Sequence, residues 1–232
     1  MKRLTLCVML VALLMGSSSA QAEWSGSVHL GSTIVRSTVP SSTVALSVEA
    51  TSVQPSTITR LSLDTLDARA DGTVTADQIR ATGHQTRRLA GRLEWYGDLS
   101  LERDRVVGLT SRMTAGPGLV YAVVQMEQMQ VGLEAGLSVV HINHGVTETY
   151  GAVRLVERGV LELSAQSRVW ELVEFWPASA QRTLLRWEVG LEGDVVGPWT
   201  LRVVAAQVSR GDAVTGETLR TLTVLTSMGY TF

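Results

Sequence analysis

Apolar and polar residues alternate with a period of two through most of the chain after residue 22. In the segment 129–139, for example, Leu133 and Leu137 share one face, and Gln130 and Glu134 share the other. Successive side chains of a β-strand point to opposite faces, so this alternation indicates strands with one apolar and one polar face. It predicts an all-β fold but does not decide which face meets water.

Residues typical of turns, namely Gly, Pro, Asp and Ser, interrupt the alternation repeatedly. The predicted turns lie at residues 37–41, 53–56, 70–75, 89–91, 105–107, 124–127, 142–146, 158–160, 174–178, 192–197 and 209–216. They separate about twelve strands, and an even number places both chain ends on one side, as in single-chain bacterial barrels. The strands are also long enough for tilted membrane strands of about 9–11 residues. Residues 23–232 are therefore predicted to form an antiparallel up-and-down transmembrane β-barrel of the bacterial outer membrane.

The first 22 residues have the three parts of a secretory signal peptide. Lys2 and Arg3 supply the positive start, residues 4–15 are apolar, and residues 20–22, Ala-Gln-Ala, form a small-x-small cleavage site. The apolar stretch is shorter than the roughly 20 residues that a helix needs to span a bilayer. We expect export and cleavage after Ala22. No later apolar run is long enough for a membrane helix, so any membrane insertion is expected to use strands.

Aromatic residues gather near the predicted strand ends on the periplasmic side. Trp and Tyr rings prefer the head-group level of a bilayer, so such a group is expected at a membrane interface. The predicted interface residues are Trp24, Trp95, Tyr121, Trp187, Trp199 and Tyr230. The alternative interpretation is that these rings fill the core of a soluble sandwich.

The C-terminal segment carries apolar residues on one face and ends on an aromatic residue. The residues of this face are Val224, Met228, Tyr230 and Phe232, with Thr226 among them. The segment resembles the last-strand signal by which outer-membrane barrels are recognised for assembly. The predicted partners are therefore the barrel assembly machinery and the lipid of the outer membrane.

Five segments carry a family resemblance over essentially the whole exported chain. They are Trp24-Ser-Gly-Ser-Val-His-Leu-Gly31, Leu101-Glu-Arg-Asp-Arg-Val-Val-Gly-Leu-Thr-Ser-Arg112, Gly116-Pro-Gly-Leu-Val-Tyr121, Leu133-Glu-Ala-Gly136 and Gly229-Tyr-Thr-Phe232. In this order they resemble the salt-induced outer-membrane proteins, also called domain of unknown function 481. The chain departs from that pattern at residues 36–40, where Arg-Ser-Thr-Val-Pro replaces the usual Gly-Asn turn. The resemblance implies an outer-membrane barrel without an established activity and supplies no catalytic residues; only the family name suggests induction by salt.

Charged residues on the polar faces are expected to point into the barrel, because an arginine facing lipid at mid-depth costs about 2–4 kcal/mol. The candidates for this lumen lining are Arg112, Glu134, Arg154, Arg186, Glu188 and Arg202. Two interpretations stay open. In one, the charges line a narrow channel for small solutes or ions; in the other, they form a ladder of ion pairs that fills and braces the barrel.

Three further motifs contain residue types that occur in functional sites. His141-Ile-Asn-His144 with Ser138 offers the residue types of a hydrolase or a metal site, but Ser138 and His141 are expected on opposite faces of one strand. Arg210-Gly-Asp212 matches an adhesion tripeptide and also fits an ordinary turn. Glu102-Arg-Asp-Arg105 fits a solvated turn or an ion pair. We predict no catalytic residues, no metal and no cofactor.

Charge and cysteine content narrow the functional classes. The net charge is −2, and the basic residues are scattered, which argues against a nucleic-acid partner. Cys7 is the only cysteine, so no disulfide or thiolate site is expected downstream. The predicted function is a non-enzymatic outer-membrane barrel, either a narrow channel or a structural, stress-related envelope protein. The alternatives are a soluble periplasmic β-sandwich or ligand-binding barrel, and a hydrolase built on a barrel wall.

Overall fold

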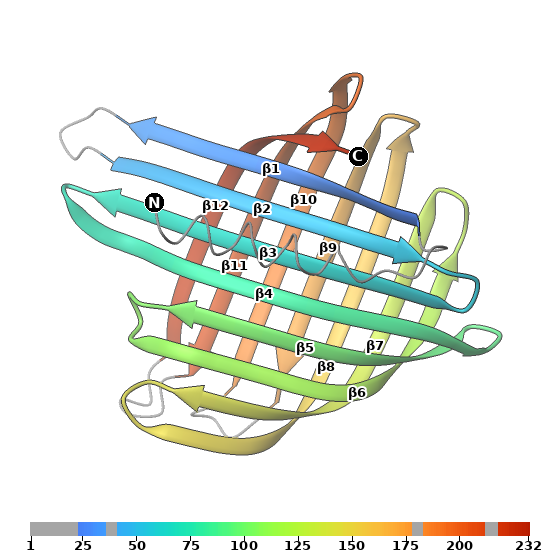
Figure 1. The fold of residues 1–232 in the computed structure, drawn as a ribbon, viewed down its shortest axis with the longest axis horizontal. Coiled ribbons are helices and arrows are strands. Elements are labelled where there is room, and N and C mark those ends of the chain that lie inside the picture. The colour runs from blue at the N-terminus through green and yellow to red at the C-terminus, as the bar shows by residue number, and fades with distance from the viewer. Residues whose placement is uncertain (1–22, 36–40, 178–182, 212–217) are drawn as a thin grey trace.

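The computed structural model describes residues 23–35, 41–177, 183–211 and 218–232, and these form a closed antiparallel barrel. The strands of the described residues are β1 (Glu23–Val35), β2 (Ser41–Val53), β3 (Thr57–Ala70), β4 (Thr73–Ala90), β5 (Leu93–Asp104), β6 (Leu109–Gln125), β7 (Met129–Asn143), β8 (Thr147–Ser164), β9 (Ser167–Trp176), β10 (Leu184–Val196), β11 (Trp199–Gly211) and β12 (Thr218–Thr231). Each strand pairs with its neighbours in the chain, and β12 pairs with β1 (Figure 1). The predicted all-β, twelve-strand, up-and-down barrel is confirmed. The predicted signal peptide, residues 1–22, lies outside the described residues.

One predicted turn is wrong. Residues 158–160 lie inside β8, where Gly159 pairs with Val131 on one side and with Glu171 on the other. The turn follows Ser164 instead. Glycine is a frequent turn residue, but it also occurs inside strands, often where another group comes close to the backbone.

The alternation of the sequence becomes the two faces of the barrel wall. One row of the register contains only residues of the inner face: His29, Ser47, Asp64, Arg80, Glu102 and Arg112. The neighbouring positions face outward and are largely apolar and exposed, among them Leu30, Val44, Leu99, Leu101, Met113, Leu133, Leu137, Leu201 and Val224. A polar inside and an apolar outside are the opposite of a soluble sandwich and the arrangement of a membrane barrel.

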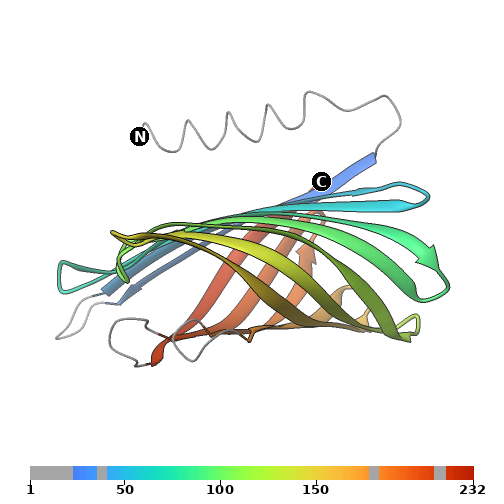
Figure 2. The ribbon, with the colours of Figure 1, turned by 90° about the horizontal axis from the view of Figure 1, so that it is seen from below.

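Both described chain ends lie at one end of the barrel, which we call the terminal end. β1 begins there and β12 ends there. The strands β1–β6 form the front wall in Figure 1 and cross the strands of the rear wall at a steep angle, and Figure 2 shows the same two walls from below. No helix of the described residues is long and apolar enough to cross a membrane.

The β1–β12 pair closes the barrel over a short register. It runs from Ser27 opposite Thr231 to Gly31 opposite Ser227. Phe232 extends this pairing, because its backbone N–H donates to the Gly26 carbonyl and its carbonyl accepts from the Gly26 N–H, each at 2.9 Å. The last residue of the chain is therefore part of the seam.

Candidate functional site in the barrel interior

The six predicted lumen-lining residues all lie on the inner face of the wall. Arg112, Glu134, Arg154 and Arg186 are buried there, whereas Glu188 and Arg202 are partly exposed. Their common orientation follows from strand alternation, because each pairs with inner-face residues of the neighbouring strands. Their role in lining a channel stays a prediction.

Arg154 of β8 lies at the centre of a buried charge cluster. Its Nη1 is 3.0 Å from Glu134 Oε2, and its Nε is 2.7 Å from Glu174 Oε1. Arg158 donates to the second oxygen of Glu134 at 2.6 Å. The three side chains Arg154, Glu134 and Glu174 are each at most 4% exposed. Buried charges are tolerated when they are paired and hydrogen-bonded, and this cluster meets both conditions.

Several ion pairs join strands that are not neighbours in the wall. Arg80 of β4 reaches Glu174 of β9, with 3.5 Å between Nη2 and Oε2. Arg210 of β11 pairs with Glu102 of β5, and its Nη1 is 3.3 Å from Asp104 Oδ2. These pairs cross the interior and hold opposite walls together.

The ion pairs of Arg210 involve residues of two sequence motifs, Glu102–Arg105 and Arg210–Asp212. Glu102 and Asp104 belong to the Glu102–Arg105 motif, and both carboxylates point inward to Arg210. Arg105, from the same motif, pairs with Asp77 at 3.1 Å. The ion-pair interpretation of the motif is therefore correct. Arg210 was predicted as part of a turn, but it belongs to β11, and Asp212 lies outside the described residues.

One side of the interior is tightly filled. Arg112 lies over the Trp176 ring at 5.3 Å, and Arg154 lies within 5.8 Å of the Tyr96 ring centre. Tyr96 is 1% exposed and packs directly over Gly118 and Gly136, where any Cβ would collide with its ring or hydroxyl. A void beside this cluster, lined in part by Arg80 and Glu174, measures about 10 Å³, which is close to the minimum for one water molecule.

Side chains on the other side of the interior are more exposed. Asp64 of β3 is exposed although it points inward, and it accepts a hydrogen bond from Ser47 at 2.7 Å. The side chain of Glu49 pairs with Arg202 at 2.7 Å and is nevertheless 43% exposed. Small inner-face side chains leave this space, namely Ser47, Ser62, Ala206, Thr223 and Ser227. We call this region the water-accessible lane.

The charges in the lane are not all neutralised. Within the described part of the chain, no arginine lies within ion-pair distance of Asp64. Arg60, on the inner face of the same strand and nearer the terminal end, is also exposed and forms no ion pair with the described residues. A sequence signal for Asp64 exists, since it lies among apolar residues of opposite parity, but the predicted lining did not include it.

The histidine motif does not form a site. His141 points outward and its Nδ1 lies 2.8 Å from Thr149 Oγ1, whereas Ser138 is buried on the inner face. The two residues lie on opposite faces, as predicted from their spacing. No group of three or more His, Cys, Asp or Glu residues in the described ranges is arranged to hold a metal ion.

Most of the predicted interface aromatics lie at the terminal end and point outward. Trp24, Trp95, Tyr121, Trp199 and Tyr230 lie within the first or last few residues of their strands on that side. Trp199 and Tyr230 also form an edge contact, with ring centres 5.5 Å apart.

Trp187 is the exception among these aromatics. It is the fourth residue of β10, which begins at the opposite end, because the turns before and after this strand lie later in the chain than predicted. It points outward and is 38% exposed. Its placement at the periplasmic interface is therefore wrong.

The predicted assembly face lies on the outside of β12. Val224, Met228, Tyr230 and Phe232 share this outward face, with exposed fractions between 44% and 63%. The face continues to the last residue, whose backbone closes the seam with Gly26. Recognition by an assembly machinery stays a prediction.

Comparisons with known proteins agree with this fold. The family model described as "Protein of unknown function, DUF481" matches residues 28–232. The translocator domain of the autotransporter NalP from Neisseria meningitidis is similar, with a TM-score of 0.50 and 11% identity, over 100% of this chain and 95% of that chain. The NanC porin is also similar, with a TM-score of 0.51 and 8% identity, over 88% of this chain and 98% of that chain. At these identities the likeness concerns the fold alone. No curated protein matches the sequence.

Proposed function

We propose that this chain, which belongs to the family of proteins of unknown function DUF481, is an outer-membrane β-barrel that conducts small ions through its water-accessible lane. The observation that carries the proposal is the exposed carboxylate of Asp64 at mid-height on the inner face. Water that reaches a mid-strand inner residue of a closed barrel must enter along the lumen. The filled side around Arg154 narrows the passage, so the conducted solutes are small.

The location in the outer membrane is part of the proposal. It is supported by the apolar outer face, the closed set of strands and the fold shared with bacterial barrels. We expect the protein in the outer-membrane fraction after cell disruption. Recovery of the folded protein in the soluble periplasm would contradict the assignment.

We assign the ion selectivity of the lane to Asp64 and Arg60, the two charges in it that form no ion pair with the described residues. Asp64 attracts cations and repels anions, whereas Arg60 has the opposite effect. Arg154, Arg158, Arg202 and Arg210 contribute less, because carboxylates neutralise them. Arg112 is buried over Trp176 on the filled side, outside the lane. Ion preference is therefore expected to depend on few residues.

The test is the current through planar bilayers that contain the purified, reconstituted protein under a salt gradient. We expect discrete conductance steps. The Asp64→Asn variant should shift the reversal potential toward anions, and Arg60→Gln should shift it toward cations. Asp67→Asn is the matched control, because Asp67 lies on the same strand but outside the barrel, paired with Arg69 at 3.5 Å.

A structural role is the second candidate. It is favoured by the buried cluster of Arg154, Glu134 and Glu174, which braces the walls and fills one side of the interior. A folded, inserted barrel that stays electrically silent under all these conditions would support this role and contradict ion conduction.

A further inference from the structure

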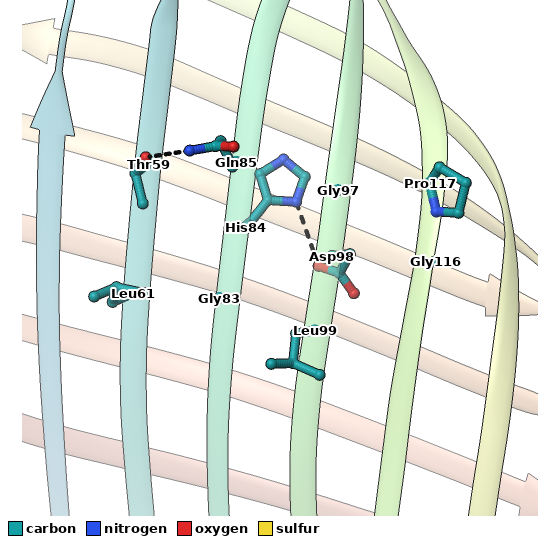
Figure 3. A pocket seen from close by; sticks show the side chains of 10 residues that line it. All are labelled: Thr59, Leu61, Gly83, His84, Gln85, Gly97, Asp98, Leu99, Gly116 and Pro117. Atoms are coloured by element: carbon teal, nitrogen blue, oxygen red, sulfur yellow. Dashed lines mark hydrogen bonds and ion pairs between the residues drawn. The ribbon is translucent and has the colours of Figure 1, made fainter. Parts of the chain in front are cut away.

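Gly83 of β4 and Gly97 of β5 leave a hollow in the outer wall of the barrel (Figure 3). Its volume is about 410 Å³, and Thr59, Leu61 and Pro117 contribute to its lining. It is a shallow depression that is largely open toward the surroundings of the barrel. The hollow lies on the outer side of the wall, because the side chains of Thr59, Leu61 and Pro117 face outward. His84, Asp98 and Gly116 also line it, although they belong to the inner-face row.

The register explains why the hollow exists. One row across the wall contains Thr59, Gln85, Gly97 and Pro117, and the next row contains Leu61, Gly83 and Leu99. Two of these outward positions have no side chain, while their neighbours are large. A flat strip of wall is therefore bordered by Leu61 on one side and Leu99 on the other (Figure 3).

The hollow is polar toward the terminal end and apolar away from it. The Gln85 side-chain amide donates to the Thr59 hydroxyl at 3.2 Å, and Gln85 is exposed. Arg87 follows two residues later on the same outward face, is exposed, and forms no ion pair with the described residues. The Trp95 ring borders the hollow at this level, because a Cβ on Gly97 would lie 3.6 Å from its Cζ3 atom.

We propose that this hollow binds one anionic phospholipid in the leaflet at the terminal end. The acyl chain lies across Gly83 and Gly97, and the phosphate lies near Gln85 and Arg87. The proposal requires the barrel to span a membrane, but it does not depend on ion conduction.

The chemistry of the wall matches this ligand at both ends. The methylene groups of the acyl chain would fill the strip and contact Leu61 and Leu99. Without them, a gap would remain there and these dispersion contacts would be lost. An exposed amide at the membrane surface gains a hydrogen-bond acceptor from the phosphate or ester oxygens, and Arg87 supplies the opposite charge. A Trp ring at the same level is typical of the lipid head-group region.

The test measures lipid retention by native mass spectrometry of the delipidated full-length barrel, with added phosphatidylglycerol or phosphatidylcholine. We expect the wild type to retain one phosphatidylglycerol in preference to phosphatidylcholine. Gly83→Leu should weaken this binding roughly tenfold, which corresponds to the loss of about two buried methylene groups. The variant should fold, because the new Cβ meets only the Leu61 Cδ2 atom, at 3.5 Å. Arg87→Gln should remove the preference for the anionic lipid.

The matched control is Gly151→Leu on β8. Gly151 also faces outward, and a Cβ there would meet no atom within 4 Å. This variant should retain the lipid like the wild type. Equal retention by Gly83→Leu and the wild type, or equal loss in both glycine variants, would overturn the proposal. Lipids with brominated chains should quench Trp fluorescence more strongly in the wild type than in Trp95→Phe, and equal quenching in the two proteins would also overturn the proposal.

Discussion

Arg154 is the residue on which the interior charge cluster depends, because it pairs with Glu134 and Glu174 simultaneously. Its removal leaves Glu134 with Arg158 and Glu174 with only the longer contact to Arg80. We expect Arg154→Met to lower the free energy of unfolding by about 3–5 kcal/mol, as for other broken buried pairs. Urea unfolding in detergent micelles measures this change.

A surface pair provides the comparison for Arg154. Arg69 and Asp67 lie 3.5 Å apart with both side chains more than half exposed. Arg69→Met should change the same free energy by no more than about 1 kcal/mol. Similar losses in the two variants would mean that the cluster does not brace the barrel.

Because Tyr96 packs over Gly136, a substitution at Gly136 should also destabilise the barrel. A Cβ at Gly136 would collide with the Tyr96 hydroxyl and come within 2.8 Å of the Pro117 carbonyl oxygen. We expect Gly136→Ala to destabilise the barrel by about 1–3 kcal/mol, the usual range for overpacking. Gly132 is the control on the same strand, because its Cβ would lie 3.7 Å from Val120 Cγ1. Equal unfolding midpoints for both variants would contradict the packing argument.

The inward orientation of Arg154 and Glu134 could be predicted from alternation alone, but their partners could not. Alternation assigns a side chain to a face, whereas an ion pair across the lumen depends on which strands oppose each other in the closed barrel. Arg80 and Glu174 are 94 residues apart, and Arg210 and Glu102 are 108 apart. Exposure of Asp64 likewise depends on the small residues of other strands.

Among the strands, the β1–β12 pair has the shortest register, with five residue pairs. The β7–β8 register extends over the full length of β7, from Met129 to Asn143. Fewer backbone hydrogen bonds hold the seam, so it should open at a lower free energy than the rest of the wall. Hydrogen exchange should be fastest in β1 and β12 and slowest near β7, and equal protection would contradict this order.

Phe232, which directly follows β12, should be important for assembly of the barrel. Deletion of Phe232 removes both backbone hydrogen bonds to Gly26 and the last aromatic of the predicted assembly face. We expect less folded barrel in the outer-membrane fraction, measured by heat-dependent gel mobility. Phe232→Tyr keeps the backbone pairing and an aromatic ring, so it should assemble normally. Normal assembly of the deletion variant would contradict a role for this residue.

Strand number and order could be predicted from the sequence, but several boundaries could not. The error at residues 158–160 arose because Gly159 was interpreted as a turn, whereas it is paired on both sides within β8. The later start of β10 then moved Trp187 to the other end of the barrel. Turn residues mark strand ends only where the register of the neighbouring strands also ends.

At the scale of the whole molecule, the interior combines a filled, charged side with a lane of exposed side chains. Arg80 crosses between the walls and restricts the lane, while Glu174 keeps its bond to Arg154 if Arg80 is removed. Arg80→Ala should therefore increase single-channel conductance without unfolding the barrel. Arg105→Ala, which alters a pair outside the lumen, is the control. An unchanged conductance in Arg80→Ala would place the conducting path elsewhere.

The accessibility of position 64 tests whether the lane is continuous. Cys7 is the only cysteine and lies in the predicted signal peptide, so Asp64→Cys would carry a single thiol after processing. We expect charged, membrane-impermeant thiol reagents added to either side of a bilayer to modify this residue and change the current, with opposite effects on ion preference for positive and negative reagents. Ser138→Cys, on the buried side of the interior, should react slowly. Modification of position 64 from one side only, or from neither side, would contradict a water-filled path through the barrel.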